Sequence, residues 1–154
     1  MITYKLLEAQ DAKKLALFEA MARKTEPSAF FEAIDVEQYE KQILMCMGKA
    51  DFQNTHIVLA MEDETVVGRC DFAVIGSFMN GQTVGYVDWV YVLKPYRHRG
   101  IAQKLFAFLE QHLRERGVEE YFLITARNEE AQQFYSSFTN SEKETDWILR
   151  KSLH

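Results

Sequence analysis

The sequence predicts one α/β (α+β) domain, with a mixed, mostly antiparallel sheet of six to seven strands and helices on both faces. The 154-residue chain is 47% apolar and 27% charged, as is typical of a globular domain. Short apolar stretches separated by polar turns predict an antiparallel meander in the middle of the chain. A helical pattern between two further apolar stretches predicts a strand–helix–strand crossover after it. We expect a single domain that spans residues 1–154.

The first third of the chain begins with a strand and continues with a helix. Residues Ile2–Leu6 alternate between apolar and polar side chains, which predicts the first strand. Apolar residues at helical spacing predict a helix over Ala12–Arg23. Residues Thr25–Ala33 contain Pro27 and Ser28, and this composition is typical of a loop.

A second helix and the meander follow. Asp35 is placed to cap a helix that runs to about Met47, and Gly48 is placed to end it. Polar turns then separate three predicted strands, which span His56–Met61, Thr65–Ile75 and Thr83–Leu93.

The last third of the chain predicts the crossover and a final strand. An amphipathic pattern predicts a helix over Ala102–Arg116, and Gly117 suits the position after its end. A strand is predicted within Glu120–Ala126, and Asn128 is placed to cap a short helix after it. The apolar stretch Trp147–Leu153 predicts the final strand.

Charge and composition disfavour several classes of protein. The net charge of −5 argues against non-specific binding of nucleic acid and is compatible with a cationic small substrate. No apolar run reaches the length of a membrane span, and no signal peptide follows Met1, so we expect a cytoplasmic protein with no membrane partner. Cys46 and Cys70 lack the spacing of a metal site or a disulfide framework. We therefore expect reduced thiols and no metal.

A basic turn at residues 95–102 is the strongest functional signal. It reads Pro95-Tyr96-Arg97-His98-Arg99-Gly100-Ile101-Ala102, between a predicted strand and a predicted helix. Free N–H groups and the helix dipole favour an anion at such a position, and a glycine lets a phosphate approach the backbone closely. The turn therefore predicts a phosphate-bearing ligand, although a plain basic surface turn would have the same pattern.

Two motifs resemble those of the GNAT superfamily of N-acetyltransferases. The first has the pattern Q/R-x-x-G-x-G/A, which the chain matches at Arg97, Gly100 and Ala102. The V-x-P-x-Y that usually precedes it is resembled at Val92, Pro95 and Tyr96, although the proline stands one position later. The second has the pattern N-x-x-A-x-x-F-Y-x-x-x-G-F, and the chain resembles it at Asn128, Ala131, Phe134, Tyr135 and Phe138. The Gly-Phe pair that ends the pattern is absent, because the chain has Ser137-Phe138 and then Thr139 at the place that the pattern gives to the glycine.

The resemblance implies transfer of an acetyl group from acetyl-CoA to an amine by direct attack. It implies that the acetyl-CoA site consists of the residues Val90, Tyr91, Val92, Arg97, His98, Arg99, Gly100, Ile101, Ala102, Asn128 and Tyr135. A backbone N–H near Val90 would polarise the thioester carbonyl, and Asn128 would contact the pantetheine arm. Asn128 would also serve as a helix N-cap, and the two roles are compatible.

Tyr135 and Asp88 are the candidate catalytic residues. By resemblance, the Tyr135 hydroxyl would protonate the leaving CoA thiolate; the alternative is an aromatic that packs beside Phe134. Asp88 is the single residue of the strand Thr83–Leu93 that is charged at neutral pH. A carboxylate in a buried strand is costly unless it is used or paired, so Asp88 would bind or deprotonate the amine, or pair with a neighbouring cation.

The acceptor is the least determined part of the expected reaction. Phe30, Phe31, Asp88 and Trp89 are the candidate acceptor-binding residues, and the aromatic ones could equally be core or dimer contacts. A small-molecule amine is the leading expectation. The alternatives are a protein N-terminus or lysine as acceptor, a non-catalytic acyl-CoA-binding module, and an unrelated phosphate-binding domain. Members of the superfamily often form homodimers, which leaves the oligomeric state open.

Overall fold

The computed structural model describes residues 1–30 and 32–154. Contacts divide the chain into two compact units, Met1–Leu123 and Ile124–His154, and each is described by itself. The first unit contains the sheet, three α-helices and the basic turn. The second contains one α-helix and the C-terminal segment.

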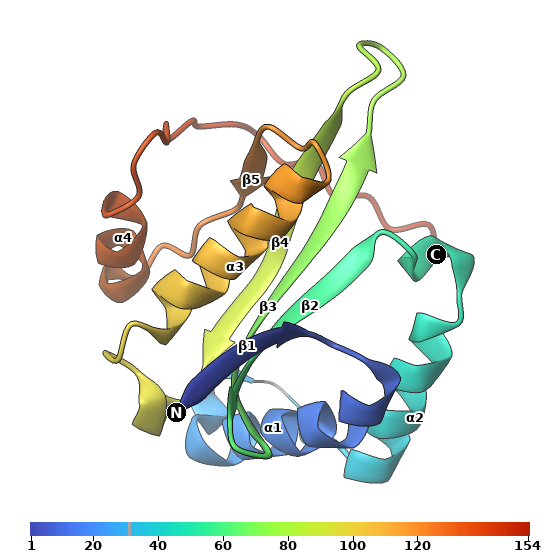
Figure 1. Cartoon of the computed structure of the whole chain (residues 1–154), viewed down its shortest axis with the longest axis vertical. Helices are drawn as coiled ribbons and strands as arrows, with labels where there is room; N and C mark the ends of the chain where they lie inside the picture. The colour runs from blue at the N-terminus through green and yellow to red at the C-terminus, as the bar shows by residue number, and fades with distance from the viewer. Residues whose placement is uncertain (31) are drawn as a thin grey trace. The chain divides into compact units, whose positions relative to one another are not determined.

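The sheet of the first unit has five strands in the order in which they occur in the chain (Figure 1). All neighbouring strands are antiparallel except the last pair, β4 and β5, which is parallel. Their bounds are β1 Ile2–Leu6, β2 Thr55–Glu62, β3 Thr65–Gly76, β4 Thr83–Val92 and β5 Tyr121–Leu123. A parallel pair needs a crossover connection, and α3 (Ile101–Glu115) supplies it.

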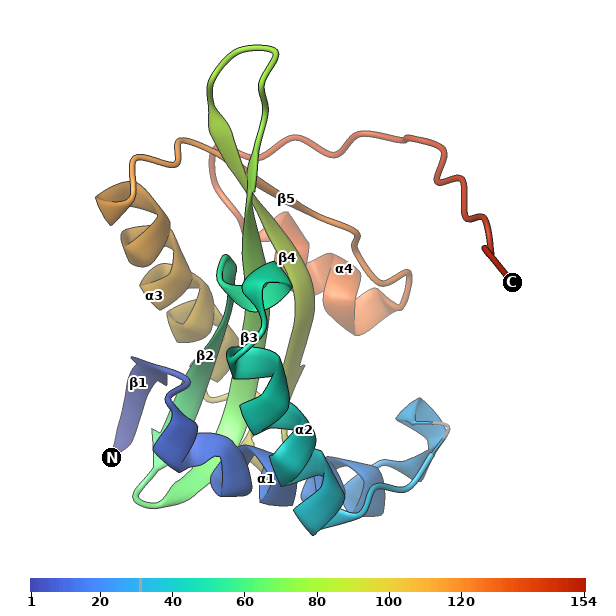
Figure 2. The same ribbon diagram turned by 90° about the vertical axis from the view of Figure 1, so that its right-hand side faces the viewer.

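Helices cover both faces of the sheet, as predicted (Figure 2). Helices α1 (Ala12–Thr25) and α2 (Val36–Met47) lie on one face, and α3 lies on the other. Two adjacent residues of β3, Gly68 and Arg69, show that the two faces of the sheet pack against different helices. Arg69 points to Glu19 of α1, whereas a Cβ at Gly68 would meet side chains of α3. Successive side chains of a strand point to opposite faces, so each strand contributes to two cores.

The predicted ends of α2 are confirmed. The Asp35 carboxylate accepts a hydrogen bond from the N–H of Gln38 at 2.8 Å, which satisfies one of the free donors of the first turn. Gly48 caps the other end. The helix predicted from Ala102 begins one residue earlier, and Gly117 takes a positive φ of 73° after it.

The second unit contains α4 (Glu129–Ser136), which has the predicted N-cap. The side chain of Asn128 accepts a hydrogen bond from the N–H of Ala131 at 2.8 Å. Ser137 ends the helix with an ordinary φ of −79°, so this position does not need the conformational freedom of glycine.

Two fold predictions are wrong. The sheet has five strands rather than six or seven, and Trp147–Leu153 has no regular secondary structure. A strand forms only where a neighbour accepts its backbone hydrogen bonds. None of the described residues pairs with Trp147–Leu153 in a sheet. The apolar pattern of these residues is therefore suited to a strand, but no neighbouring strand is present in the described part of the chain to pair with them.

Substitution of Gly85 should destabilise the first unit, because β5 and α3 approach this residue closely. A Cβ at Gly85 would lie 2.9 Å from a methyl group of Leu113 and 2.9 Å from Cβ of Tyr121. We expect Gly85→Ala to lower the free energy of unfolding by about 1–3 kcal/mol, the usual cost of overpacking. Urea denaturation measures this change. Gly76→Ala is the control, since nothing lies within 4 Å of its added Cβ, and an equal loss there would contradict the packing argument.

Candidate active site

A β-bulge in β4 places Asp88 and its neighbours. Asp71 of β3 pairs with Trp89, but the next residue, Phe72, pairs with Val87, so Asp88 is an extra residue in β4. A bulge shifts the alternation of side chains by one position. Beyond Asp88, therefore, Trp89 and Tyr91 face α1 and α2 rather than α3.

A pocket of about 320 Å³ opens on the α1 and α2 face beside this bulge. Side chains from α1, α2, β3, β4 and the loop after α1 line it. They are Glu19, Arg23, Phe30, Tyr39, Arg69, Asp71, Asp88 and Trp89. Three carboxylates and two guanidiniums give this lining a formal charge of −1 (−3 + 2), which favours a cationic ligand.

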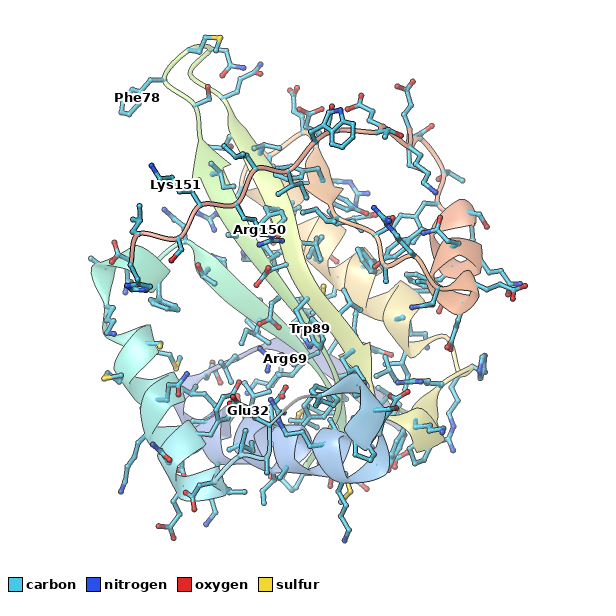
Figure 3. The ribbon with its side chains drawn as sticks, turned by 180° about the vertical axis from the view of Figure 1, so that it is seen from behind. Glu32, Arg69, Phe78, Trp89, Arg150 and Lys151 are labelled. Atoms are coloured by element: carbon cyan, nitrogen blue, oxygen red, sulfur yellow. The ribbon has the colours of Figure 1, made fainter. Side chains whose placement is uncertain are left out.

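Arg69 forms the polar floor of the pocket and is only 7% exposed. Its Nη1 donates to Glu19 at 2.6 Å, its Nε donates to Asp71 at 2.7 Å, and its Nη2 also donates to Asp71. Burial raises the pKa of the Asp71 carboxyl, while the guanidinium of Arg69 opposes that shift. A buried charge is tolerated only when it is paired in this manner. Figure 3 shows Arg69 beside Trp89 of the neighbouring strand.

Asp88 is the pocket carboxylate that lacks a cation. It is exposed, because the bulge turns it away from the strand interior, and this corrects the expectation of a carboxylate buried in a strand. Its Oδ1 accepts a hydrogen bond from the Tyr86 hydroxyl at 3.3 Å. Within residues 1–30 and 32–154, no cation pairs with it. The unpaired negative charge of the pocket therefore lies at Asp88.

Aromatic rings form one wall of the pocket. Phe30 makes edge contacts with Trp89 and Tyr91, with ring centroids 6.3 and 5.3 Å apart. Trp89 and Tyr91 are stacked on each other at 6.4 Å. The structure thus brings together three of the predicted acceptor-side residues, Phe30, Asp88 and Trp89. Phe31, the fourth, lies outside the described residues.

On the side of β4 that faces away from β3, the backbone N–H of Val90 has no strand partner among the described residues. The N–H of Leu93 donates to the carbonyl of Val67 on β3 at 3.0 Å. Backbone groups of an antiparallel strand alternate in direction, so those of Val92 and Val90 point away from β3. On that side the pairing with β5 ends at Val87. In the described part of the chain, Val90 therefore has no strand partner for its N–H.

The turn of residues 95–102 leads from β4 into α3. Two residues in it have positive φ angles, His98 at 61° and Gly100 at 73°. An added Cβ at Gly100 would meet only Oε1 of Gln103, at 3.9 Å, so open space lies above the glycine rather than packed side chains. Ile101 is buried in the core, while Arg99 lies over the ring of Tyr96 with its Cζ 5.1 Å from the centroid.

Arg97 points back toward the loop that follows α1. Its Nη1 and Nη2 donate to Glu26 at 3.3 and 2.5 Å, and its Nε donates to the carbonyl of Val92 at 3.1 Å. Glu26 also accepts a hydrogen bond from the Tyr91 hydroxyl at 2.6 Å. Hydrogen bonds from Arg97 and then Tyr91 lower the pKa of the Glu26 carboxyl, so this carboxylate stays ionised at neutral pH.

The remaining predicted residues, Asn128 and Tyr135, belong to the second unit. Asn128 is the N-cap of α4, as described above. Tyr135 packs against Phe134 and Phe138, with ring centroids 5.1 and 5.5 Å away. The packing role expected as an alternative for Tyr135 is therefore present, and it leaves the role of the hydroxyl as a prediction.

Sequence reasoning missed most of the polar lining of the pocket. Arg69 and Asp71 are two opposite charges at alternate positions of an otherwise apolar strand. Because alternate residues share a face, this pattern already indicates an ion pair on one side of β3. Glu19, Arg23 and Tyr39 carry no such signal, because they are single polar residues on amphipathic helices.

Among residues 1–30 and 32–154, no cluster of three or more His, Cys, Asp or Glu side chains could hold a metal ion. Over the same residues, no helix is both long enough and apolar enough to cross a bilayer.

Comparison with known proteins identifies the family. The profile of the family described as "Acetyltransferase (GNAT) family" matches residues 16–138. A curated relative, the "Uncharacterized N-acetyltransferase in pepI 3'region" of Lactobacillus delbrueckii subsp. lactis, is 29% identical over 79 residues. That alignment covers 44% of this chain and 46% of the relative, so the chain spans about half the length of that protein.

Two solved structures show the same fold. The aminoglycoside acetyltransferase meta-AAC0020 from an uncultured soil metagenomic sample, in complex with sisomicin, has a TM-score of 0.80 and 19% identity. The match covers 99% of this chain and 97% of that one. The ribosomal-protein-alanine N-acetyltransferase of Brucella melitensis biovar Abortus 2308 has a TM-score of 0.75 and 22% identity, over 98% and 100% of the two chains. The match of the family model to residues 16–138 shows that the chain belongs to the GNAT acetyltransferase family, whose members take acetyl-CoA as acyl donor.

Proposed function

We propose that this chain transfers an acetyl group from acetyl-CoA to the primary amine of a small, cationic molecule. The main support for this proposal is that two different sites lie on the two sides of β4. One side has an acidic, aromatic pocket at Asp88, and the other has the N–H of Val90, which no described strand pairs with. The two positions lie two residues apart, so an amine and a thioester bound at them would be close enough to react.

The donor would bind along the edge of β4 and at the basic turn. The first N–H groups of α3 have no partners within the helix, and with the helix dipole they suit a pyrophosphate. The open space above Gly100 lets phosphate oxygens reach those groups. Arg99 and His98 add donors at the same turn, and Asn128 of the second unit would contact the pantetheine arm.

The acceptor would bind in the pocket beside Asp88. A volume of about 320 Å³ is near the lower end for small-molecule sites, which favours a compact amine over a folded protein. The formal charge of −1 favours a cationic acceptor, and the faces of Phe30 and Trp89 suit a cation or a sugar ring. The two similar proteins are named for different acceptors, an aminoglycoside and a ribosomal protein. Of these two classes, the pocket of this chain favours the small molecule.

The reaction needs three contributions from the protein. The amine lone pair forms a C–N bond to the thioester carbonyl carbon, and the C–S bond breaks, so that CoA leaves as a thiolate. The N–H of Val90 donates to the carbonyl oxygen as negative charge develops there. Asp88 accepts the amine proton directly or through water, and the Tyr135 hydroxyl donates a proton to the thiolate.

Gly100→Val should weaken binding of acetyl-CoA without unfolding the protein. A β-branched side chain is strained at a φ of 73°, and it would fill the space that phosphate oxygens need. We expect the dissociation constant from calorimetry to rise at least about tenfold. Gly117→Val is the matched control, because Gly117 also has a φ of 73° but lies at the other end of α3. Equal affinity losses in the two variants would refute the turn as the donor site.

The proposed reaction is tested by a screen of amines that follows release of the CoA thiol. We expect turnover with small cationic amines and amino sugars, and little with anionic amines, because the pocket carries net negative charge. Peptides with a free N-terminus or a lysine belong in the same screen. Turnover confined to peptides would replace the small-molecule acceptor with a protein acceptor, and binding without turnover on any amine would overturn the proposal.

Asp88→Asn should lower catalysis more than it lowers acetyl-CoA affinity. Removing a general base typically costs about 100-fold or more, so we expect kcat/KM for the amine to fall by about that factor. The dissociation constant of acetyl-CoA should change less than about twofold. Asp63→Asn is the control, since it removes the same charge from an exposed turn. Unchanged activity of the Asp88 variant between about pH 6 and 9 would remove this residue from the mechanism.

Tyr135→Phe tests the proposed acid and keeps the ring that packs against Phe134 and Phe138. We expect kcat to fall about tenfold or more while acetyl-CoA affinity stays within about twofold. Steady-state kinetics and calorimetry measure the two quantities. If kcat is unchanged, the hydroxyl plays no part in the chemistry and Tyr135 is a packing residue.

A further inference from the structure

Residues 26–30 carry one wall of the acceptor pocket, and we call them the Phe30 segment. It begins at Glu26, where α1 ends with an N–H that donates to the carbonyl of Ala22 at 3.0 Å. A short 3-10 turn, Pro27–Ala29, follows and brings Phe30 onto Trp89 and Tyr91. Backbone hydrogen bonds within this turn join Ala29 to Glu26 and Phe30 to Pro27, and the segment pairs with none of the described strands, so side-chain contacts hold it against β4.

Arg23 fixes the chain just beyond the Phe30 segment. Its Nε donates to the carbonyl of Glu32 at 2.9 Å, and its Nη1 donates to Glu19, whose other oxygen binds Arg69. Its guanidinium also lies over the Phe30 ring, with Cζ 4.7 Å from the centroid. Figure 3 shows Glu32 near Arg69, on the same face of the sheet as Trp89. This end is thus connected to the pocket floor.

Glu26 fixes the other end, and its partners are Arg97 of the basic turn and Tyr91 of the aromatic wall. Its two carboxylate oxygens accept hydrogen bonds from Arg97 and from the Tyr91 hydroxyl. The Glu26 side chain is 22% exposed, as is that of Arg97, so the pair is largely removed from solvent. Two parallel N–H···O bonds to one carboxylate give a well-defined geometry as well as attraction.

Arg97 is in turn oriented by β4. Its Nε donates to the carbonyl of Val92, and its Cζ lies 5.3 Å from the centroid of the Tyr91 ring. Moving the guanidinium to a phosphate would take its two hydrogen bonds from the Glu26 carboxylate and leave it the Tyr91 hydroxyl and the charge of Lys94, and breaking a largely buried ion pair is costly. The observed geometry therefore favours Glu26, rather than a phosphate, as the partner of Arg97.

We propose that Glu26 is a positioning residue that joins the donor turn to the acceptor pocket: through Arg97 and Tyr91 it holds Phe30 against Trp89 and thereby sets acceptor affinity. This inference rests on the proposed function, since it assigns the pocket to the acceptor amine. It gives Arg97 a different role from the acetyl-CoA contact that the family motif implies. The Glu26–Arg97 ion pair would therefore influence the acceptor pocket, although Arg97 lies in the turn proposed to bind acetyl-CoA.

The test uses the full chain with Trp147→Phe as parent, so that Trp89 is the single tryptophan left of the two. Glu26→Gln is compared with Glu64→Gln, an exposed carboxylate whose partner is Lys14. Three quantities are measured on each protein. They are the acetyl-CoA dissociation constant from calorimetry, the acrylamide quenching constant of Trp89, and KM and kcat for the amine found in the screen.

In Glu26→Gln we expect the amine KM to rise about fivefold or more, while kcat and the acetyl-CoA dissociation constant change less than about twofold. The Trp89 quenching constant should rise by about half or more, because Phe30 no longer shields the 42% exposed indole as closely. Glu64→Gln should match the parent throughout. Arg97→Gln should reproduce the Glu26→Gln changes, and the double variant should be no worse than either single one.

The opposite pattern would overturn the inference. If Arg97→Gln weakens acetyl-CoA binding at least about tenfold while Glu26→Gln leaves both the amine KM and the quenching of Trp89 unchanged, Arg97 is a phosphate ligand and Glu26 has no positioning role. A parent protein that acetylates no amine refutes the proposed function instead. In that case the quenching of Trp89 still decides whether Glu26 holds the Phe30 segment.

Discussion

The buried guanidinium of Arg69 is the interaction on which the polar face of the first unit depends. It lies between Glu19 of α1 and Asp71 of its own strand, with the Tyr39 hydroxyl of α2 at 3.5 Å. Removing a charge from water is costly, and only well-placed partners offset the cost. The sheet and two helices must therefore meet in one arrangement to satisfy it. That arrangement fixes the floor of the pocket and, through Glu19 and Arg23, the loop beyond it.

Local signals predicted most of the elements, because the residues that begin and end them act on their own backbone. Asp35 and Gly48 predicted the ends of α2 correctly, and the alternation of side chains predicted both bounds of β1, Ile2–Leu6. The prediction of a strand over Trp147–Leu153 was wrong because a strand also needs a neighbouring strand, which a local sequence pattern cannot provide. The glycine of the second motif falls at Thr139 in this chain, and Thr139 is not among the described residues with a positive φ, so its backbone does not require a glycine.

The candidate site was predicted in part for a similar reason. Phe30, Asp88 and Trp89 were expected on the acceptor side and do line one pocket. The exposure of Asp88 was not foreseen, because a bulge arises from the pairing of two strands and leaves no mark in one of them. The partner of Arg97 was also unforeseen, since Glu26 lies 71 residues away in the sequence. Long-range pairing of this kind needs the fold to be known first.

The extra residue at Asp88 also governs how β4 can be compared with other proteins. Before it, Gly85 faces α3; after it, Val92 faces α3 and Tyr91 faces α1. The alternation of side chains between the two faces of β4 thus shifts by one residue at Asp88. An alignment with a relative that lacks the extra residue needs a one-residue gap there, and without it every later position would be assigned to the wrong side of the sheet. The face of the sheet to which a residue points, more than its identity, decides which residues of β4 correspond between such proteins.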